Sequence, residues 1–247
     1  MKITYIHHSA FCVEIEDKVL VFDYYNGTSV EACLYHGKMP RYDGNQEIYV
    51  FSSHSHRDHF DYEVLAWSKI YPNIHYIFAK DIRRKLGNSM LRRLQAPEDI
   101  RERICYVKPN EVHRIGSIRV ETLLSTDQGV AYLVTCAGKV IYHAGDLNWW
   151  HWEGESMLDN QYQEATYQAQ IDRLSDRKID VAFVVLDPRQ GADMYRGIQY
   201  FMEHVKARRV IPMHMWKHYE YIGKYKKTIP EEWADRIEEI KEENQVL

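Results

Sequence analysis

The sequence predicts an α/β fold in which sheet layers are covered by helices. Apolar runs typical of buried strands alternate with helix-like segments along the whole chain. With 247 residues, 45% of them hydrophobic, the chain can bury a substantial core. No low-complexity linker, internal repeat or sharp change in composition interrupts it. We therefore predict a single domain over residues 1–247.

Strands dominate the first half of the prediction. A meander of three short strands begins the chain, and its second turn is formed by Glu16-Asp17. An irregular loop rich in turn residues follows, up to residue 45. The strands are predicted at Lys2–His7, Ala10–Ile15, Lys18–Phe22, Ile48–Phe51, Ile74–Phe78 and Ile104–Val107, and helices at Asp61–Ile70, Asp81–Leu86 and Ser89–Leu94.

The second half begins with another meander and then alternates helices with strands. The meander strands are Ser117–Leu124, Val130–Cys136 and Lys139–His143. Helices are expected at Asp159–Leu174 and Ile198–Lys206, and continuous apolar strands at Asp180–Asp187 and Val210–Met213. A last helix is predicted from the capping box at Thr228-Ile-Pro-Glu231 to about Asn244.

The densest group of chemistry-bearing residues follows the apolar run that ends at Phe51. It is the segment His54-Ser-His56-Arg-Asp58-His59. In an extended chain His54 and His56 point the same way, so both can bind one cation. Asp58 and His59 follow at a turn and point elsewhere, which suits a second cation. The segment therefore predicts a metal site on the loop that leaves this strand.

Two later strands deliver similar side chains at their C-terminal ends. The run from Val140 ends in Gly145-Asp146, and the run from Val210 ends in His214. A carboxylate such as Asp146 can bridge two cations, and His214 can complete the shell of the second ion with Asp58 and His59. Two divalent ions about 3.5–4 Å apart would hold a bridging hydroxide as nucleophile. Metal binding is needed because free water provides almost no hydroxide at neutral pH.

The segment His54-x-His56-x-Asp58-His59 resembles the signature of the metallo-β-lactamase superfamily. Gly145-Asp146 and His214 fall where that family has its later ligands, and the resemblance covers essentially the whole chain. The segments around Asp146 and His214 are most similar to the compact branch that includes L-ascorbate-6-phosphate lactonase and related hydrolases. The resemblance implies a four-layer αβ/βα sandwich, a site for two ions of zinc or manganese, with iron as a further alternative, and hydrolysis.

One position departs from the family pattern, because the family normally has another histidine before Gly145-Asp146. Here the strand leads into Leu124-Ser-Thr-Asp127, and Asp127 is the nearest ligand-type residue. An oxygen ligand would shift the preference toward harder ions such as Mn²⁺. Asp127 is equally well explained as a turn residue before Gly129, and His113, which precedes a strand, is the other candidate ligand.

Several residues near these strand ends have alternative roles. We expect Asp23 to orient a metal ligand or the HxHxDH loop, whereas His8 is better explained as a turn histidine that could reach the site. Asp187 either lines the pocket rim or serves a turn. His143 is interpreted as structural.

The aromatic segment Trp149-Trp150-His151-Trp152 directly follows the Asp146 loop. It suggests a substrate wall with His151 as proton donor to the leaving group, although the tryptophans could equally pack over the core. Lys217 and His218 could bind an anionic group of the substrate, or form a solvated loop. The basic cluster Arg83-Arg84-Lys85 is interpreted as a solvated helix face.

Composition narrows the function further. The net charge is -4, which does not favour a nucleic-acid or membrane surface as the main partner. No signal peptide or run of about 18 apolar residues is present, and Cys12, Cys33, Cys105 and Cys136 are expected to be free thiols. We therefore predict a cytoplasmic, metal-dependent hydrolase, zinc being the first choice of metal, with Asp58, Asp146 and His151 in catalytic roles.

The predicted partner is a small-molecule substrate, an anionic ester, lactone or phosphodiester, and a homo-oligomer is compatible with the sequence. The alternatives are a phosphodiesterase or nuclease of the same superfamily, or a metal-binding protein without catalysis. Nuclease members usually carry an added nucleic-acid-binding domain or long insertion, and this chain has neither.

Overall fold

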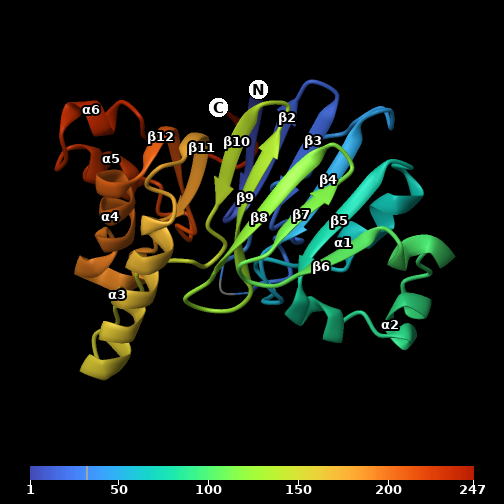
Figure 1. Ribbon diagram of the computed structural model, residues 1–247, viewed down its shortest axis with the longest axis horizontal. Helices are drawn as coiled ribbons and strands as arrows, with labels where there is room; N and C mark the ends of the chain where they lie inside the picture. Colours follow the sequence, from blue (N-terminus) through green and yellow to red (C-terminus); the bar gives the residue numbers. More distant parts are fainter. Residues whose placement is uncertain (32) are drawn as a thin grey trace. The chain divides into compact units, whose positions relative to one another are not determined.

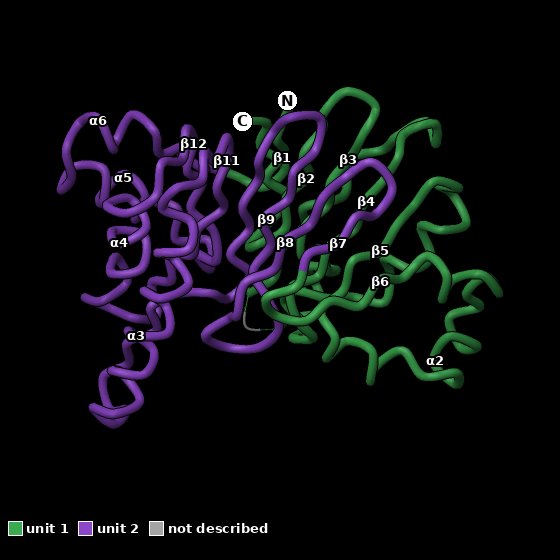
Figure 2. Tube along the Cα trace, viewed as in Figure 1, with its two compact units in different colours: residues 1–111, 242–247 green, residues 112–241 purple. Residues whose placement is uncertain are grey.

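A computed structural model describes residues 1–31 and 33–247. The chain forms two compact units (Figure 2), which we describe separately. Unit 1 comprises Met1–Glu111 with Glu242–Leu247, and unit 2 comprises Val112–Lys241. The single domain over residues 1–247 stays a prediction.

Unit 1 is built on a seven-stranded sheet, and several of its strands are labelled in Figure 1. Across the sheet the strands are β13 (Gln245–Val246), β1 (Lys2–His7), β2 (Ala10–Ile15), β3 (Lys18–Phe22), β4 (Glu47–Ser52), β5 (Ile74–Ala79) and β6 (Ile104–Val107). β3 to β6 pair in parallel, and β1 runs the same way because β2 is antiparallel to both β1 and β3. The loops after β1, β3, β4 and β5 therefore leave the same edge of the sheet.

Short helices cover one face of this sheet. They are α1 (Glu63–Ala66), α2 (Asn88–Arg93) and the 3-10 turns η1 (Trp67–Lys69), η2 (Lys80–Arg84) and η3 (Glu98–Arg101). The paired residues Val21 of β3 and Val50 of β4 belong to one buried cluster with Val64 and Leu65 of α1. Tyr76 ties the helix to the sheet by donating its hydroxyl hydrogen to the carbonyl of Val64 at 2.9 Å.

Unit 2 contains a six-stranded sheet. Its strands, in order across the sheet, are β12 (Lys206–Met213), β11 (Lys178–Val185), β10 (Lys139–His143), β9 (Val130–Cys136), β8 (Ile118–Leu124) and β7 (Val112–Ile115). β10, β11 and β12 are parallel. The C-terminal ends of these three strands meet at one edge, where open α/β sheets place ligands.

The helices of unit 2 are α3 (Met157–Asp172), α4 (Arg196–His204), α5 (Glu220–Lys226) and α6 (Glu231–Ala234), with the 3-10 turn η4 (Pro188–Asp193). α3 begins after Ser156, whose hydroxyl oxygen accepts from the amide of Asp159 at 3.1 Å. α4 packs on the sheet through Phe201, which stacks on Tyr142 with ring centroids 5.5 Å apart.

The predicted last helix begins at Glu231, within the expected start segment, but its predicted extent to Asn244 is wrong. Helix α6 ends at Ala234, and the chain then follows β12: the amide of Glu238 donates to the carbonyl of Val210, and Ile237 and Ile240 are buried. A continued helix would carry glutamates at its C-terminal end, where the helix dipole disfavours them. Strand-like pairing with β12 therefore outweighs helix propensity, and the chain end adds β13 beside β1.

Other elements differ in extent. The helix predicted at Asp61–Ile70 is divided into α1 and the 3-10 turn η1, and the segment Asp81–Leu86 forms the 3-10 turn η2. β7 and α5 were not predicted, since both are short and mostly polar. As expected, the four cysteines are thiols that form no disulfide among the described residues. Across the described ranges, the helices are too short or too polar to cross a membrane.

Candidate metal centre

In unit 1 the candidate ligands lie on the loop that leaves β4. Backbone amides of His59 and Phe60 donate to the carbonyl of His56, which closes a tight turn. His54 Nε2 and His56 Nδ1 are 2.9 Å apart. Two nitrogens bound to one tetrahedral zinc ion would be about 3.3 Å apart. The two rings therefore already converge as ligands of a single ion would.

Asp23, which follows β3, holds this loop in place. One carboxylate oxygen accepts the amide of Ser53 at 2.7 Å, and the other accepts the hydroxyl of Ser53 and Nδ1 of His59, each at 2.7 Å. Asp23 is completely buried. The prediction that Asp23 orients the HxHxDH loop is confirmed. A neutral His59 ring that donates from Nδ1 to Asp23 has an unprotonated Nε2, as a metal ligand must have.

Asp58 lies between two histidines of unit 1. One of its carboxylate oxygens is 3.5 Å from Nε2 of His8 and 3.8 Å from Nε2 of His59. His8 is fully buried, and its Nδ1 is 3.3 Å from the hydroxyl of Tyr35. The ligand atoms of the three residues lie within 4.8 Å of one another, a spacing that can hold a metal ion. His8 lies in the turn after β1, as the sequence favoured, and it also reaches Asp58 and His59.

In unit 2, two carboxylates lie close together. Asp146 follows the left-handed Gly145 after β10, and Asp127 follows β8; their ligand oxygens lie within 4.8 Å of one another. Thr126 links the two loops by donating to the carbonyl of Asn148 at 2.7 Å. This proximity supports the hypothesis that Asp127 is a ligand, which stays a prediction. Among the described residues, His113 on β7 belongs to no such group.

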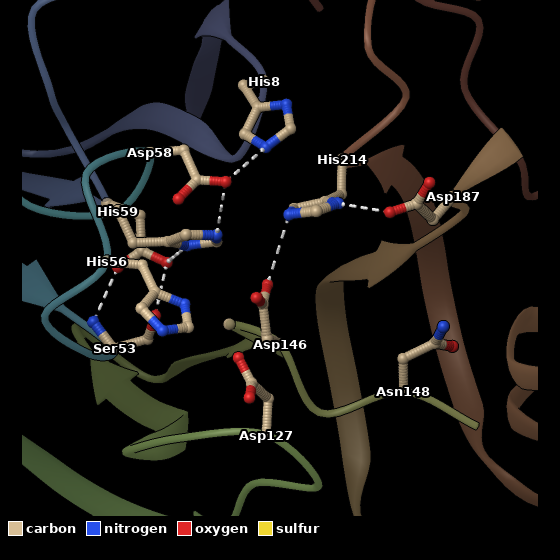
Figure 3. Close-up of polar contacts among 12 residues, drawn as sticks. His8, Ser53, His56, Asp58, His59, Asp127, Asp146, Asn148, Asp187 and His214 are labelled. Carbon is tan, nitrogen blue, oxygen red and sulfur yellow. Dashed lines mark hydrogen bonds and ion pairs between the residues drawn. The ribbon is translucent and has the colours of Figure 1, made fainter. Parts of the chain in front are cut away.

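His214 follows β12, with its Nε2 at 3.5 Å from Oδ1 of Asp146. On the other side of the ring, Nδ1 is 2.9 Å from a carboxylate oxygen of Asp187, which is fully buried after β11 (Figure 3). Asp187 therefore orients His214 as Asp23 orients His59. The predicted turn role of Asp187 is confirmed, because Oδ1 of its carboxylate accepts the amide hydrogen of Arg189 at 2.9 Å at the start of η4. The contact with His214 was not predicted.

Asp187 also forms a bidentate pair with Arg189, with guanidinium contacts of 2.5 to 3.0 Å. Burial raises the pKa of Asp187, but hydrogen bonds from His214 and Arg189 outweigh it and hold the pKa well below its usual range. The carboxylate is therefore ionised at neutral pH, which fixes the tautomer of His214.

Backbone conformation marks the same residues. Asp23, His8 and His214 have φ values of 43°, 50° and 66°, in the left-handed region that non-glycine residues rarely adopt. Each costs of order 1 kcal/mol and persists only where surrounding contacts impose it. Turn residues outside the centre, such as Glu16 and Ala137, share this conformation, so the backbone shows that contacts fix these three positions and does not by itself indicate a function.

Aromatic side chains surround His214. The indole of Trp150 donates to the carbonyl of Asp146 at 3.0 Å, lies edge-on to His214 at 6.1 Å, and stacks on Trp152 at 5.7 Å. Trp150 is buried, whereas Trp152 and His151 are partly exposed. Trp150 therefore packs over the core, as one interpretation of this segment expects, while the substrate wall stays a prediction. His143 accepts a hydrogen bond from the amide of Gly145, in keeping with a structural role.

A family model described as the β-lactamase superfamily domain matches residues 2–153. The chain belongs to the metallo-β-lactamase superfamily. It therefore has the metallo-β-lactamase fold, the α/β sandwich that the sequence predicts, and at this coarse level it is a member of a superfamily of metal-binding hydrolases.

Three solved structures are similar in fold over the entire chain. Igni18, a metallo hydrolase from Ignicoccus hospitalis, is 15% identical, with a TM-score of 0.68 over 100% of this chain and 97% of its own. An isothiocyanate hydrolase from Delia radicum gut bacteria has 15% identity and a TM-score of 0.58, covering 100% and 98%. CmlA, a diiron β-hydroxylase from Streptomyces venezuelae, has 13% identity and a TM-score of 0.61, with 100% of this chain matching 53% of CmlA. The narrower resemblance to the lactonase branch stays a prediction.

Proposed function

We propose that the protein is a hydrolase that uses two divalent metal ions, zinc in the first place, to cleave a small anionic ester, lactone or phosphodiester. The proposed ligands are His54, His56, Asp58, His59, Asp127, Asp146 and His214. Membership of the metallo-β-lactamase superfamily supports this set. The observation that carries the proposal is the pair of carboxylate-oriented histidines, His59 on Asp23 and His214 on Asp187. Such carboxylate–histidine pairs are the usual support of metal ligands.

The donor chemistry fits divalent ions. Each unit supplies imidazole nitrogens and carboxylate oxygens, the ligands that zinc, manganese and iron share. When bound, the ions would polarise the scissile group and lower the pKa of a water molecule. The carboxylate pair Asp127 and Asp146 adds oxygen ligands and makes manganese and iron realistic alternatives to zinc.

The chain's own residues would orient the reacting groups. Asp58 is placed to accept the proton of the attacking water, because its side chain is partly exposed, at 19%, and lies beside His8 and His59. His151 would protonate the leaving group: it is accessible, and Asp193 holds its Nδ1 at 2.8 Å. Trp152 would form part of the wall against which a small substrate binds.

The proposal is tested by metal analysis and by turnover of a substrate panel. The panel contains lactones, phosphodiesters, thioesters and an isothiocyanate, assayed with Zn²⁺ and with Mn²⁺. We expect two metal equivalents per chain. Asp58→Ala and Asp146→Ala should lower turnover about a thousandfold or more, since several kcal/mol of transition-state stabilisation are lost, with circular dichroism unchanged.

Asp17→Ala removes an exposed carboxylate elsewhere in unit 1 and should leave turnover unchanged. Full activity of Asp58→Ala or Asp146→Ala at unchanged metal content would refute the proposal. One metal equivalent or none, without turnover, would favour a non-catalytic metal-binding protein. Two iron ions without hydrolysis would instead favour oxidative chemistry such as that named for CmlA.

A further inference from the structure

A cationic hollow lies in unit 1 beside the HxHxDH loop. It has a volume of about 640 Å³ and is lined by Lys80, Asp81, Arg83 and Arg84 of η2. η2 begins directly after β5, which pairs in parallel with β4. The hollow therefore lies at the edge of the sheet from which the candidate metal ligands emerge.

Three of the four side chains that line the hollow are cations. Across residues 1–31 and 33–247, no carboxylate forms an ion pair with Lys80, Arg83 or Arg84. The guanidinium of Arg83 lies over the ring of Tyr106, 5.9 Å from its centroid, which directs this side chain without neutralising it. Like charges around a hollow repel one another and create a positive potential that concentrates anions.

The one carboxylate of the hollow already has a structural role. Oδ2 of Asp81 accepts the amide hydrogen of Ser55 at 2.8 Å, and Lys85 donates to the carbonyl of Ser55. Ser55 separates His54 from His56, so η2 supports the metal motif through the backbone. Oδ1 of Asp81 is buried without a hydrogen-bond partner among the described residues. An anion bound in the hollow would therefore contact the same 3-10 turn, η2, that holds the HxHxDH loop through Ser55.

We propose that this hollow binds a dianionic phosphoryl group carried by the substrate, an inference that rests on the proposed hydrolase function. Arginine presents a planar fork of donors that matches two phosphate oxygens, and Lys80 adds a point charge. Because Asp81 of the same 3-10 turn bonds the amide of Ser55, a phosphoryl group bound in the hollow would position the rest of a small substrate from the segment that supports the ligand loop. The basic cluster, interpreted from sequence as a solvated face, then sets substrate specificity.

The test uses the metal-loaded protein, with inorganic phosphate as the probe, titrated by calorimetry. The double variant Arg83→Gln/Arg84→Gln should weaken phosphate binding at least tenfold, since two charge-assisted contacts are lost. The matched control is Arg92→Gln/Arg93→Gln on α2, which removes the same charge from a surface that does not line the hollow. Its phosphate affinity should equal that of the wild type.

A second measurement compares three esters that share one scissile bond and carry a neutral, a carboxylate or a phosphate arm. For the phosphate ester, Arg83→Gln/Arg84→Gln should raise KM at least tenfold with little change in kcat, while the neutral ester is hydrolysed as by the wild type. Unaltered phosphate affinity of the double variant, no phosphate binding by the wild type, or a preference for the carboxylate arm would overturn the inference. If no ester is hydrolysed by the wild type, the proposed function fails, while the phosphate titration still decides whether the hollow binds this anion.

Discussion

The two units hold a histidine by the same device. In unit 1, Asp23 follows β3 and orients His59 on the loop after the neighbouring parallel strand β4. In unit 2, Asp187 follows β11 and orients His214 after the neighbouring parallel strand β12. Both aspartates are completely buried. A carboxylate at the end of one parallel strand thus fixes a ring from the next.

The devices differ in what else they hold. Asp23 accepts the amide and hydroxyl of Ser53, so it fixes the backbone that leads into His54. Asp187 instead engages the guanidinium of Arg189, which lies over the ring of Trp216 at 4.5 Å. The unit 1 aspartate therefore shapes a ligand loop, whereas the unit 2 aspartate joins a ligand to a charged and aromatic surface. The same aspartate–histidine contact is therefore combined with a fixed loop backbone in unit 1 and with an arginine–tryptophan surface in unit 2.

Among the variants that test this comparison, we expect the largest change in metal content for substitutions of Asp127. If the two carboxylates of unit 2 compensate for the absent histidine, Asp127→Ala should reduce the bound metal from two equivalents to one. Asp127→His should keep two equivalents and raise the preference for Zn²⁺ over Mn²⁺, because imidazole is the softer ligand. Metal content measured by mass spectrometry after dialysis tests both.

The control is Asp176→Ala, which removes an exposed carboxylate of the same unit and should retain both ions. Two tightly bound equivalents in Asp127→Ala would show that Asp127 is a turn residue, and the first ion would then need a different third ligand.

A smaller effect separates the two orienting aspartates. Asp23→Asn and Asp187→Asn should each weaken metal binding roughly 10- to 100-fold, the usual effect of losing a carboxylate that supports a ligand. Asp187→Asn should also lower the melting temperature, because the variant leaves Arg189 without its carboxylate partner. Metal titration and thermal unfolding of the same samples measure both quantities. Equal metal affinity in wild type and Asp23→Asn would show that Asp23 does not support a metal ligand in the way proposed for Asp187.

Much of the candidate centre could be predicted because it depends on local order. Within six residues, one loop carries His54, His56, Asp58 and His59. The C-terminal ends of parallel strands meet at one edge of a sheet, whatever the order of the strands across it. Asp146 and His214 were found in this way. Most strands were also predicted within one or two residues, since their apolar runs are continuous.

The remainder depends on contacts between distant segments. Whether Asp187 faces His214 is decided by β11 and β12 being neighbours, which no local pattern encodes. His8 is placed beside Asp58 by a left-handed turn whose strain only tertiary contacts can impose. The segment after Ala234 has helix-forming residues, yet pairing with β12 determines its course.

The smallest expected effect concerns Arg189, and it tests whether the guanidinium or the imidazole dominates at Asp187. Because the pKa of Asp187 is lowered in the folded state, this carboxylate stabilises the fold above its unfolded pKa of about 3.9, and the contribution is lost as pH falls below that value. Arg189→Gln removes one of the two causes that lower the pKa, while burial still raises it. The contribution should shrink, and the acid unfolding midpoint should move to higher pH.

At neutral pH the same variant should bind metal within about threefold of the wild type, because Asp187 still accepts from His214 and only an indirect support of that ligand is removed. The matched control, Arg196→Gln, breaks a pair with Asp193, whose side chain is 26% exposed, so its acid midpoint should shift less. An unchanged midpoint in Arg189→Gln would mean that His214 alone keeps Asp187 ionised. The two units would then differ in their surroundings but not in how their aspartates are held.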